Sequence, residues 1–167
     1  DTDRSRGLGD VYKRQKFAEE NGMEPIRISQ INYSLAHSSV ETFGDNTLVC
    51  MDTKEFRWYK KHDFPVMAFS PQAKGFFAKL AKGDAANNLP EGQYAGPANL
   101  ARLAKVKQLS EQTGDTPAKI TLGYLNSQPF FVSSVFAVTK LWQLDEDMEA
   151  QDLTYDPKTV AFLENMI

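Results

Sequence analysis

The sequence predicts an α/β protein with parallel strands, and three observations support this prediction. Short runs rich in apolar and β-branched residues occur at 25–31, 65–70 and 130–138, and we expect the last run to form a buried strand. Helical segments separate each run from the next, so the strands must run parallel with helices covering the sheet. Three strands are few for a complete α/β domain. We therefore expect a fragment of either a doubly wound sheet or a (β/α)8 barrel.

The composition is that of an ordinary globular protein, with 167 residues, 41% hydrophobic residues, 25% charged residues and a net charge of -3. This acidic balance argues against an electrostatic nucleic-acid surface. The single cysteine, Cys50, has no partner for an internal disulfide, which favours a reducing compartment. No apolar run approaches the ~18 residues of a membrane helix, and no signal-peptide pattern opens the chain. We expect a soluble, cytoplasmic protein that binds neither nucleic acid nor membrane.

Residues 1–15 differ from the rest because they are polar and have no helical or strand periodicity. Within them, Asp10–Gln15 (DVYKRQ) resembles the in-frame translation of a transposase adapter used in sequencing libraries. A natural disordered terminus is the alternative. We predict that residues 1–15 are a non-native leader and that residues 16–167 form the folded part.

Capping residues mark several helix boundaries. Gly22 follows a segment that we interpret as the end of a helix, and Gly114 closes a helix that begins near Leu100. Asp52, with Glu55 three residues later, indicates a helix start. The pair Thr116–Pro117 begins another helix, which runs to about residue 128, because proline suits the first helical position.

Two long segments lack a helical or strand pattern, at 32–51 and at 72–97. The second is rich in Gly, Ala, Asn and Pro, and loops of that length are usually functional lids or disordered. After the last strand, Leu141, Leu144 and Met148 define an amphipathic helix. The pair Asp156–Pro157 begins a final helix.

Polar or aromatic residues occupy the carboxyl ends of the predicted strands, at Gln30, at Phe69–Ser70 and at 138–140. Ligands of parallel α/β proteins collect at this edge of the sheet. A helix begins around Lys140, and its free N–H groups would favour an anion. A hydrogen-bonded glutamine, a core phenylalanine and a turn serine would give the same pattern, so these residues alone leave both interpretations open.

Four segments, in this order and spacing, resemble the last three strand–helix units of the aldo-keto reductase family: RISQINYSLAHSS, PVMAFSPQAKGFF, TPAKITLGYLNSQPF and LWQLDEDMEAQDL. The resemblance extends over essentially residues 16–167. It implies the C-terminal portion of a (β/α)8 TIM barrel, with about three parallel strands and crossover helices. It also implies an NAD(P)-dependent oxidoreductase that reduces a small carbonyl substrate by hydride transfer, with NADP(H) favoured over NAD(H).

The resemblance implies cofactor-binding roles for residues after the first two strands. Gln30 falls on the position that hydrogen-bonds the nicotinamide carboxamide, and Phe69 on the position that stacks on the nicotinamide ring. Ser70 matches a donor to the pyrophosphate, over which the loop containing Gln72 and Gly75 passes. A flat aromatic face positions the ring, and a glycine lets the backbone approach a phosphate closely.

The resemblance further implies that the segment from Ala137 to Asp147 holds the adenosine phosphate and the adenine, through Thr139, Lys140, Gln143, Glu146 and Asp147. Some of these positions depart from the family. Gln143 stands where many relatives have Arg, which weakens recognition of a 2′-phosphate, and Lys140 offers a partial compensation. Asp147 stands where Asn is common and adds a negative charge, while Ala137 replaces a usual Gly or Lys.

The family's catalytic Asp, Tyr, Lys and His lie on earlier strands, so the resemblance implies no catalytic residue in this chain, and no metal site is predicted. Residue type alone does not assign those roles to Tyr33 or Lys74. Two functions stay open. The chain is either the cofactor-binding fragment of a reductase, inactive by itself, or part of a cofactor-binding regulatory or interaction subunit of the same fold.

Overall fold

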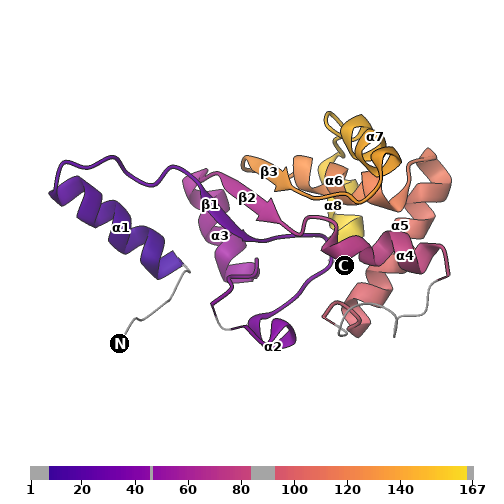
Figure 1. Ribbon diagram of the computed structural model, residues 1–167, viewed down its shortest axis with the longest axis horizontal. Helices are drawn as coiled ribbons and strands as arrows, with labels where there is room; N and C mark the ends of the chain where they lie inside the picture. Colours follow the sequence, from indigo (N-terminus) through magenta and orange to yellow (C-terminus); the bar gives the residue numbers. More distant parts are fainter. Residues whose placement is uncertain (1–7, 46, 84–92, 165–167) are drawn as a thin grey trace.

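Three short parallel strands form the centre of the computed structural model, which describes residues 8–45, 47–83 and 93–164 (Figure 1). They are β1 (Ser29–Asn32), β2 (Val66–Phe69) and β3 (Val132–Val135), hydrogen-bonded in the order β1-β2-β3. Both neighbouring pairs are parallel, so their carboxyl ends share one edge of the sheet. The predicted parallel order is confirmed, although each strand is shorter than the apolar run that predicted it.

Helices occupy every connection between the strands, as a parallel sheet requires. The arrangement is an open parallel sheet with helices between its strands, which is a portion of a TIM barrel. In chain order the helical elements are α1 (Leu8–Glu20), α2 (Val40–Phe43), α3 (Thr53–His62), the 3-10 turn η1 (Ala73–Gly75), α4 (Phe76–Ala81), α5 (Pro97–Thr113), α6 (Pro117–Asn126), α7 (Leu141–Glu149) and α8 (Pro157–Glu164).

The capping signals are confirmed in the structure. The Asp52 side chain accepts a hydrogen bond from the Glu55 backbone N–H at 2.7 Å and begins α3. The Thr116 hydroxyl accepts from the Lys119 N–H at 3.3 Å and begins α6. Gly114 closes α5 with a φ of 80°, a left-handed conformation that glycine adopts without a Cβ clash.

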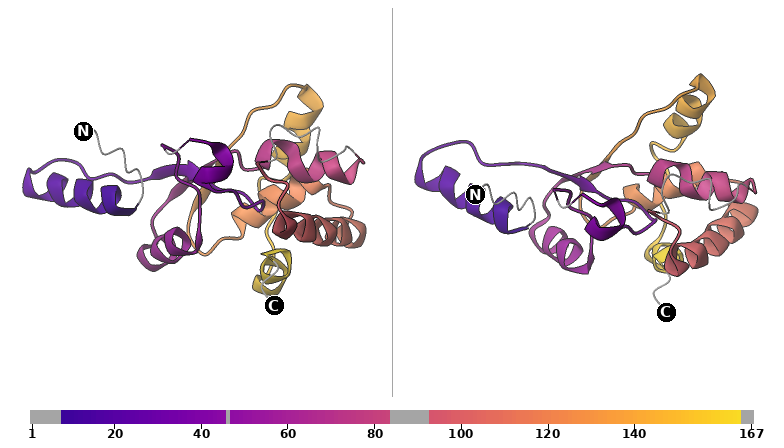
Figure 2. Two further views of the ribbon diagram at one scale, coloured as in Figure 1. Left: turned by 90° about the horizontal axis from the view of Figure 1, so that it is seen from below. Right: turned by 60° about the horizontal axis from the view of Figure 1, so that its bottom comes forward.

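The first helix starts earlier than the sequence predicts. Helix α1 begins at Leu8, so it runs through most of the predicted leader instead of only ending near Asn21. Val11 and Ala18 are buried, and the Gln15 side chain donates to the Ile26 carbonyl oxygen at 2.6 Å. Figures 1 and 2 show α1 apart from the sheet, at the end of an extended segment. The non-native origin of residues 1–15 stays a prediction.

Both segments predicted as loops contain helices. Helix α2 lies within 32–51, and η1 and α4 lie within 72–97. Helix α4 forms because Phe76, Phe77 and Leu80 supply a short apolar face, and all three side chains are buried. Residues 84–92 of the predicted loop lie outside the described residues.

The two faces of the sheet differ in burial. On one face Ile31, Val66 and Ala68 have at most 1% of their surface exposed. Tyr59 of α3 and Tyr124 of α6 belong to the same buried apolar cluster. The register pairs Gln30 with Met67 and Met67 with Ser133, so these residues share the opposite face, since side chains alternate along a strand.

This opposite face is open. Gln30 is exposed, and so are apolar residues of the third strand run, with Phe131 62% and Val135 38% exposed. The prediction that residues 130–138 form a buried strand is therefore wrong for this face. The helix predicted from Leu141, Leu144 and Met148 is confirmed as α7, yet its apolar stripe is also exposed. None of the helices in the described ranges is long and apolar enough to cross a membrane.

Candidate functional site

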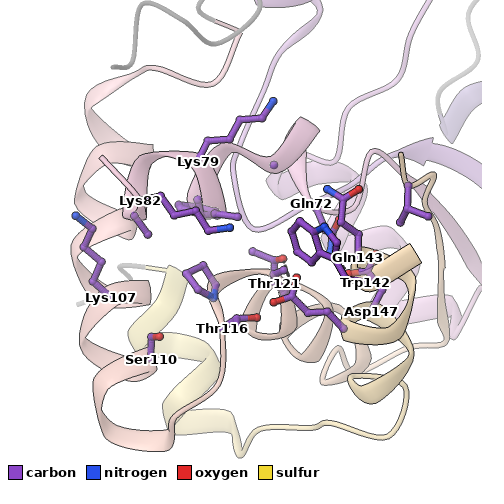
Figure 3. Close-up of a pocket in the computed structure, with 18 of the residues that line it drawn as sticks. Gln72, Lys79, Lys82, Lys107, Ser110, Thr116, Thr121, Trp142, Gln143 and Asp147 are labelled. Carbon is purple, nitrogen blue, oxygen red and sulfur yellow. Dashed lines mark hydrogen bonds between the residues drawn. The ribbon is translucent and has the colours of Figure 1, made fainter. Parts of the chain in front are cut away.

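A cavity of about 740 Å³ opens beside the carboxyl ends of β2 and β3 (Figure 3). Its walls come from η1 and α4 on one side, from the α5–α6 junction on another, and from α7 with the segment before it. Cavities of this size commonly bind small molecules and cofactors in proteins. The position agrees with the rule that ligands of parallel sheets lie at the carboxyl edge.

Several residues singled out in the sequence lie together in this cavity, namely Gln72, Gly75, Gln143 and Asp147. A direct hydrogen bond joins two of them, from Gln72 Nε2 to Asp147 Oδ1 at 2.5 Å. The bond connects the loop after β2 with the last turn of α7, across 75 positions of sequence. It therefore ties two walls of the cavity together.

The Asp147 carboxylate is held in an unfavourable environment. The residue is 4% exposed, and Oδ2 is buried without a hydrogen-bond partner among the described residues. Burial raises the pKa of Asp147, the hydrogen bond from Gln72 opposes that rise, and the neighbouring charge of Glu146 adds to it. A carboxylate in the last turn of a helix also faces the negative end of the helix dipole. Asp147 Oδ2 could accept a hydrogen bond from a donor on a ligand.

The loop between β2 and α4 has an unusual backbone. Ser70, Ala73, Lys74 and Gly75 all have φ between 50° and 80°. The left-handed conformation costs a non-glycine residue roughly 1–2 kcal/mol, so it persists only where surrounding contacts fix it. One such contact is the hydrogen bond from Lys74 Nζ to Gln93 Oε1 at 2.8 Å. The loop is thus held in one conformation at the cavity wall.

At the start of α7, Gln143 has a structural contact. Its Oε1 atom accepts hydrogen bonds from the backbone N–H groups of Thr139 and Lys140, each at 3.0 Å, and from the Thr139 hydroxyl at 3.1 Å. These bonds fix the turn that leads into the helix. Thr139 and Lys140 do not line the cavity, whereas Gln143 does.

Gln30, Phe69 and Ser70 lie outside the cavity, on β1 and at the end of β2. Phe69 pairs with Asn32 in register, so Gln30 and Phe69 share the open face of the sheet on neighbouring strands. Ser70 follows Phe69 directly and leads into the loop that reaches the cavity. The structure thus divides the predicted residues between the open face and the cavity.

The sequence analysis missed three lysines and an aromatic ring that line the cavity. Lys79, Lys82 and Lys107 line it, as does Trp142 at the start of α7. The Lys82 Nζ atom lies 5.2 Å from the centroid of the Trp142 ring. The spacing of Lys79 and Lys82 would place both on one face of a helix, but the segment was predicted as a loop.

Neither Tyr33 nor Lys74 lines the cavity. Tyr33 is 3% exposed and packs its ring against Tyr124 and Phe130, with centroids 6.3 and 6.4 Å away. The Lys74 Nζ atom donates a hydrogen bond to Gln93 Oε1 and lies over the Phe43 ring. Within the described part of the chain, no group of three or more His, Cys, Asp or Glu side chains could hold a metal ion.

Residues 14–167 match the family model described as the Aldo/keto reductase family. The match extends over more than half of the chain and includes all three strands, the cavity and the open face. It supports an oxidoreductase function at the level of the family. The chain belongs to the aldo/keto reductase family.

Proposed function

We propose that this chain is the cofactor-binding C-terminal part of an NAD(P)H-dependent carbonyl reductase. The observation that carries the proposal is the convergence of Gln72, Gly75, Gln143 and Asp147 on one cavity at the carboxyl edge of the sheet. These residues come from segments far apart in sequence, and each matches a family position for the cofactor. Proteins of this family use a nicotinamide cofactor, and NADP(H) is the form we favour.

The residues present fit such a cofactor. A dinucleotide needs a cavity for its adenosine half, donors for its phosphates and a flat surface for its nicotinamide ring. The cavity supplies the first, together with a buried Asp147 oxygen that lacks a partner. Lys79 and Lys82 on the cavity wall provide positive charge for phosphates. Phe69, on the open face beside β1, provides the aromatic surface.

The chain's own residues would then orient the cofactor for reaction. Gln30 would donate to and accept from the carboxamide, and Phe69 would cover one face of the nicotinamide ring. Ser70 would donate to the pyrophosphate at the start of the fixed loop. When bound, the cofactor supplies the hydride for reduction of a carbonyl group. The proton donor to the carbonyl oxygen would come from strands that precede these residues.

The open surfaces support the view that further strands belong to this protein. Phe131 and Val135 expose apolar surface on one face of the sheet, and α7 exposes Leu141, Leu144 and Met148. A closed barrel has no open edges, and its inner side chains pack against each other. We therefore propose that the missing part of the barrel covers these surfaces and that this chain alone has no reductase activity.

The test is a titration of the chain with NADPH, followed by the fluorescence of the reduced nicotinamide. Ser70→Ala should weaken binding by about 1.5–3 kcal/mol, or roughly ten- to a hundredfold, because it removes a donor to a charged group. Phe69→Ala should change the emission of the nicotinamide more than the affinity, since it removes only the ring contact.

Phe131→Ala is the matched control, because Phe131 lies on the same open face at the opposite end of the strands. It should bind NADPH like the parent chain. If Ser70→Ala binds NADPH like the parent and Phe69→Ala leaves the nicotinamide emission unchanged, the proposed cofactor contacts are wrong. Activity needs a separate test on a longer protein that includes the upstream coding sequence. That protein should reduce a carbonyl substrate if the upstream sequence encodes an intact set of Asp, Tyr, Lys and His. Binding without reduction would instead indicate a regulatory or interaction subunit.

A further inference from the structure

Trp142 is an unusual feature of the cavity. It occupies the first turn of α7 and lines the cavity, yet 54% of its surface is exposed. Its indole is a large apolar surface, and such rings commonly gain most of their stabilisation from burial or from stacking on another flat group. Across the cavity the ring contacts Lys82, whose Nζ atom lies 5.2 Å from the ring centroid.

Trp142 and Lys82 come from different walls. Lys82 follows α4, and Trp142 belongs to α7. The hydrogen bond between Gln72 and Asp147 joins the same two regions at 2.5 Å and limits how far they can separate. Figure 3 shows Trp142 near Gln72 and Asp147, with the Lys82 side chain pointing into the cavity toward the ring. A flat ring, a cation and a buried acceptor oxygen therefore meet at one place.

We propose that Trp142 is the surface on which the base of the bound nucleotide stacks, and that Lys82 leaves the ring to pair with a phosphate of that nucleotide. This inference rests on the proposed function, because it assumes that the cavity takes the adenosine half of the cofactor. It names a contact for the base that the family resemblance did not assign, since the resemblance gives no individual role to Trp142 or Lys82.

The relative strengths of the contacts support this exchange. An exposed cation over an aromatic ring is a weak contact, whereas a nucleobase stacked on an aromatic side chain is a stronger one. A base on the ring would take the space that Lys82 now covers. The released ammonium remains a few ångströms away, within reach of a phosphate carried by the adjacent ribose. The unpartnered Asp147 Oδ2 could accept from an amino group on the edge of the base.

The experiment uses tryptophan fluorescence, because the chain has only two tryptophans, Trp58 and Trp142. Trp58→Phe leaves Trp142 as the single reporter, and Trp142→Phe leaves Trp58. The Trp58 ring packs against Tyr59, His62 and Phe64, and it is not part of the cavity lining. The ligands are adenosine 2′,5′-bisphosphate, adenosine and ribose 5-phosphate, which separate the base from the phosphate.

We expect adenosine 2′,5′-bisphosphate and adenosine to quench Trp142 in the Trp58→Phe protein, and ribose 5-phosphate to leave its emission unquenched. The emission of Trp58 in the Trp142→Phe protein should not respond to any of the three. By calorimetry, Trp142→Leu should weaken bisphosphate binding roughly tenfold or more. Trp142→Phe should retain part of that affinity, because it keeps a ring. Lys82→Gln should weaken binding of the bisphosphate and leave binding of adenosine unchanged.

The outcomes separate this inference from the proposed function. If the parent chain binds the bisphosphate and NADPH, but Trp142 is not quenched and Trp142→Leu binds like the parent, the cofactor site stands and the stacking role is wrong. If Lys82→Gln weakens adenosine and bisphosphate equally, the phosphate contact is wrong. If the parent chain binds neither the bisphosphate nor NADPH, both this inference and the proposed function are overturned.

Discussion

The two faces of the sheet differ in how much of their apolar surface the described residues cover. On the covered face, Ile31, Val66 and Ala68 are buried under helices and belong to one continuous apolar cluster. On the other face, Phe131 and Val135 expose apolar surface near and on β3, and Gln30 is exposed on β1. A stable sheet buries its apolar face against another layer. The covered face therefore has its second layer within the described residues, whereas the open face has no such layer there.

In the cavity beside the sheet, the two oxygens of one buried carboxylate differ in the same way, since one has a hydrogen-bond partner and the other has none among the described residues. Buried polar groups in proteins are nearly always hydrogen-bonded, so an unpartnered one needs an explanation. Asp147 Oδ2 is such a group, whereas Asp147 Oδ1 is satisfied by Gln72. Apolar surface without cover occurs on the open face, which we assign to the rest of the barrel. The buried oxygen without a donor occurs in the cavity, which we assign to the cofactor.

The largest effect should come from a pair of neighbouring residues that face opposite sides. Phe130 is 5% exposed and its ring contacts Phe56 and Tyr59, with centroids 5.5 and 5.9 Å away. Phe130→Ala should lower the free energy of unfolding by about 3–5 kcal/mol, because it leaves a cavity in the covered core. Denaturant unfolding followed by circular dichroism measures the change.

The matched variant is Phe131→Ala, which removes a ring that is 62% exposed. Its cost should stay within about 0.5 kcal/mol, as for other exposed positions. In a longer protein that contains the remaining strands, the same change should cost more. Equal losses for both variants in this chain would contradict the contrast between the two faces.

The contrast also explains which features the sequence could predict. The parallel arrangement of the strands and the starts of α3 and α6 follow from local signals in the sequence, and both are confirmed. The third strand was predicted to be buried because it is an apolar run, and α7 was predicted as an amphipathic helix from its periodicity. Such patterns identify an apolar face without saying what covers it. Phe131 and Leu141 are exposed because the described chain provides no layer over them.

The cavity was harder to predict because its contacts join distant segments. The bond between Gln72 and Asp147 spans 75 positions, and no local pattern reports it. Lys82 was missed because the composition of residues 72–97 indicated a loop, and the short helix α4 depends on burial of Phe76 and Phe77. The family resemblance singled out Gln72 and Asp147 by position, while the structure was needed to bring them into contact.

An intermediate effect should follow from removing the buried charge of Asp147. Asp147→Asn keeps an acceptor for Gln72 and should stabilise the chain by about 1 kcal/mol at about pH 7, because no desolvated charge remains. The sign of the pH dependence follows from the raised pKa of this carboxyl. The protonated Asp147 side chain contributes stability that is fully present below pH 3.8, the ordinary pKa of the group. This contribution is lost as the pH rises through the higher pKa of the folded state.

The difference between Asp147→Asn and the parent chain should therefore shrink toward acid pH, and denaturant unfolding at about pH 4 and about pH 7 measures it. Asp145→Asn is the control, since Asp145 is exposed on the same helix. It should change the stability little at either pH. Loss of stability in Asp147→Asn at neutral pH would show that the charged hydrogen bond with Gln72 outweighs the cost of burial.

The smallest effect concerns Gln143, which faces the cavity but is satisfied within the chain. Its Oε1 atom accepts hydrogen bonds from the N–H groups of Thr139 and Lys140, which precede α7 and have no partner within the helix. Gln143→Ala removes that acceptor and should lower the free energy of unfolding by about 0.5–1 kcal/mol, as for a lost helix cap. Gln143→Glu keeps an acceptor and adds a negative charge near the helix start, so it should match the parent or exceed it slightly. Denaturant unfolding of both variants decides the matter. If Gln143→Ala unfolds like the parent while its affinity for NADPH falls, Gln143 belongs with Asp147 as a residue held for the ligand instead of for the fold.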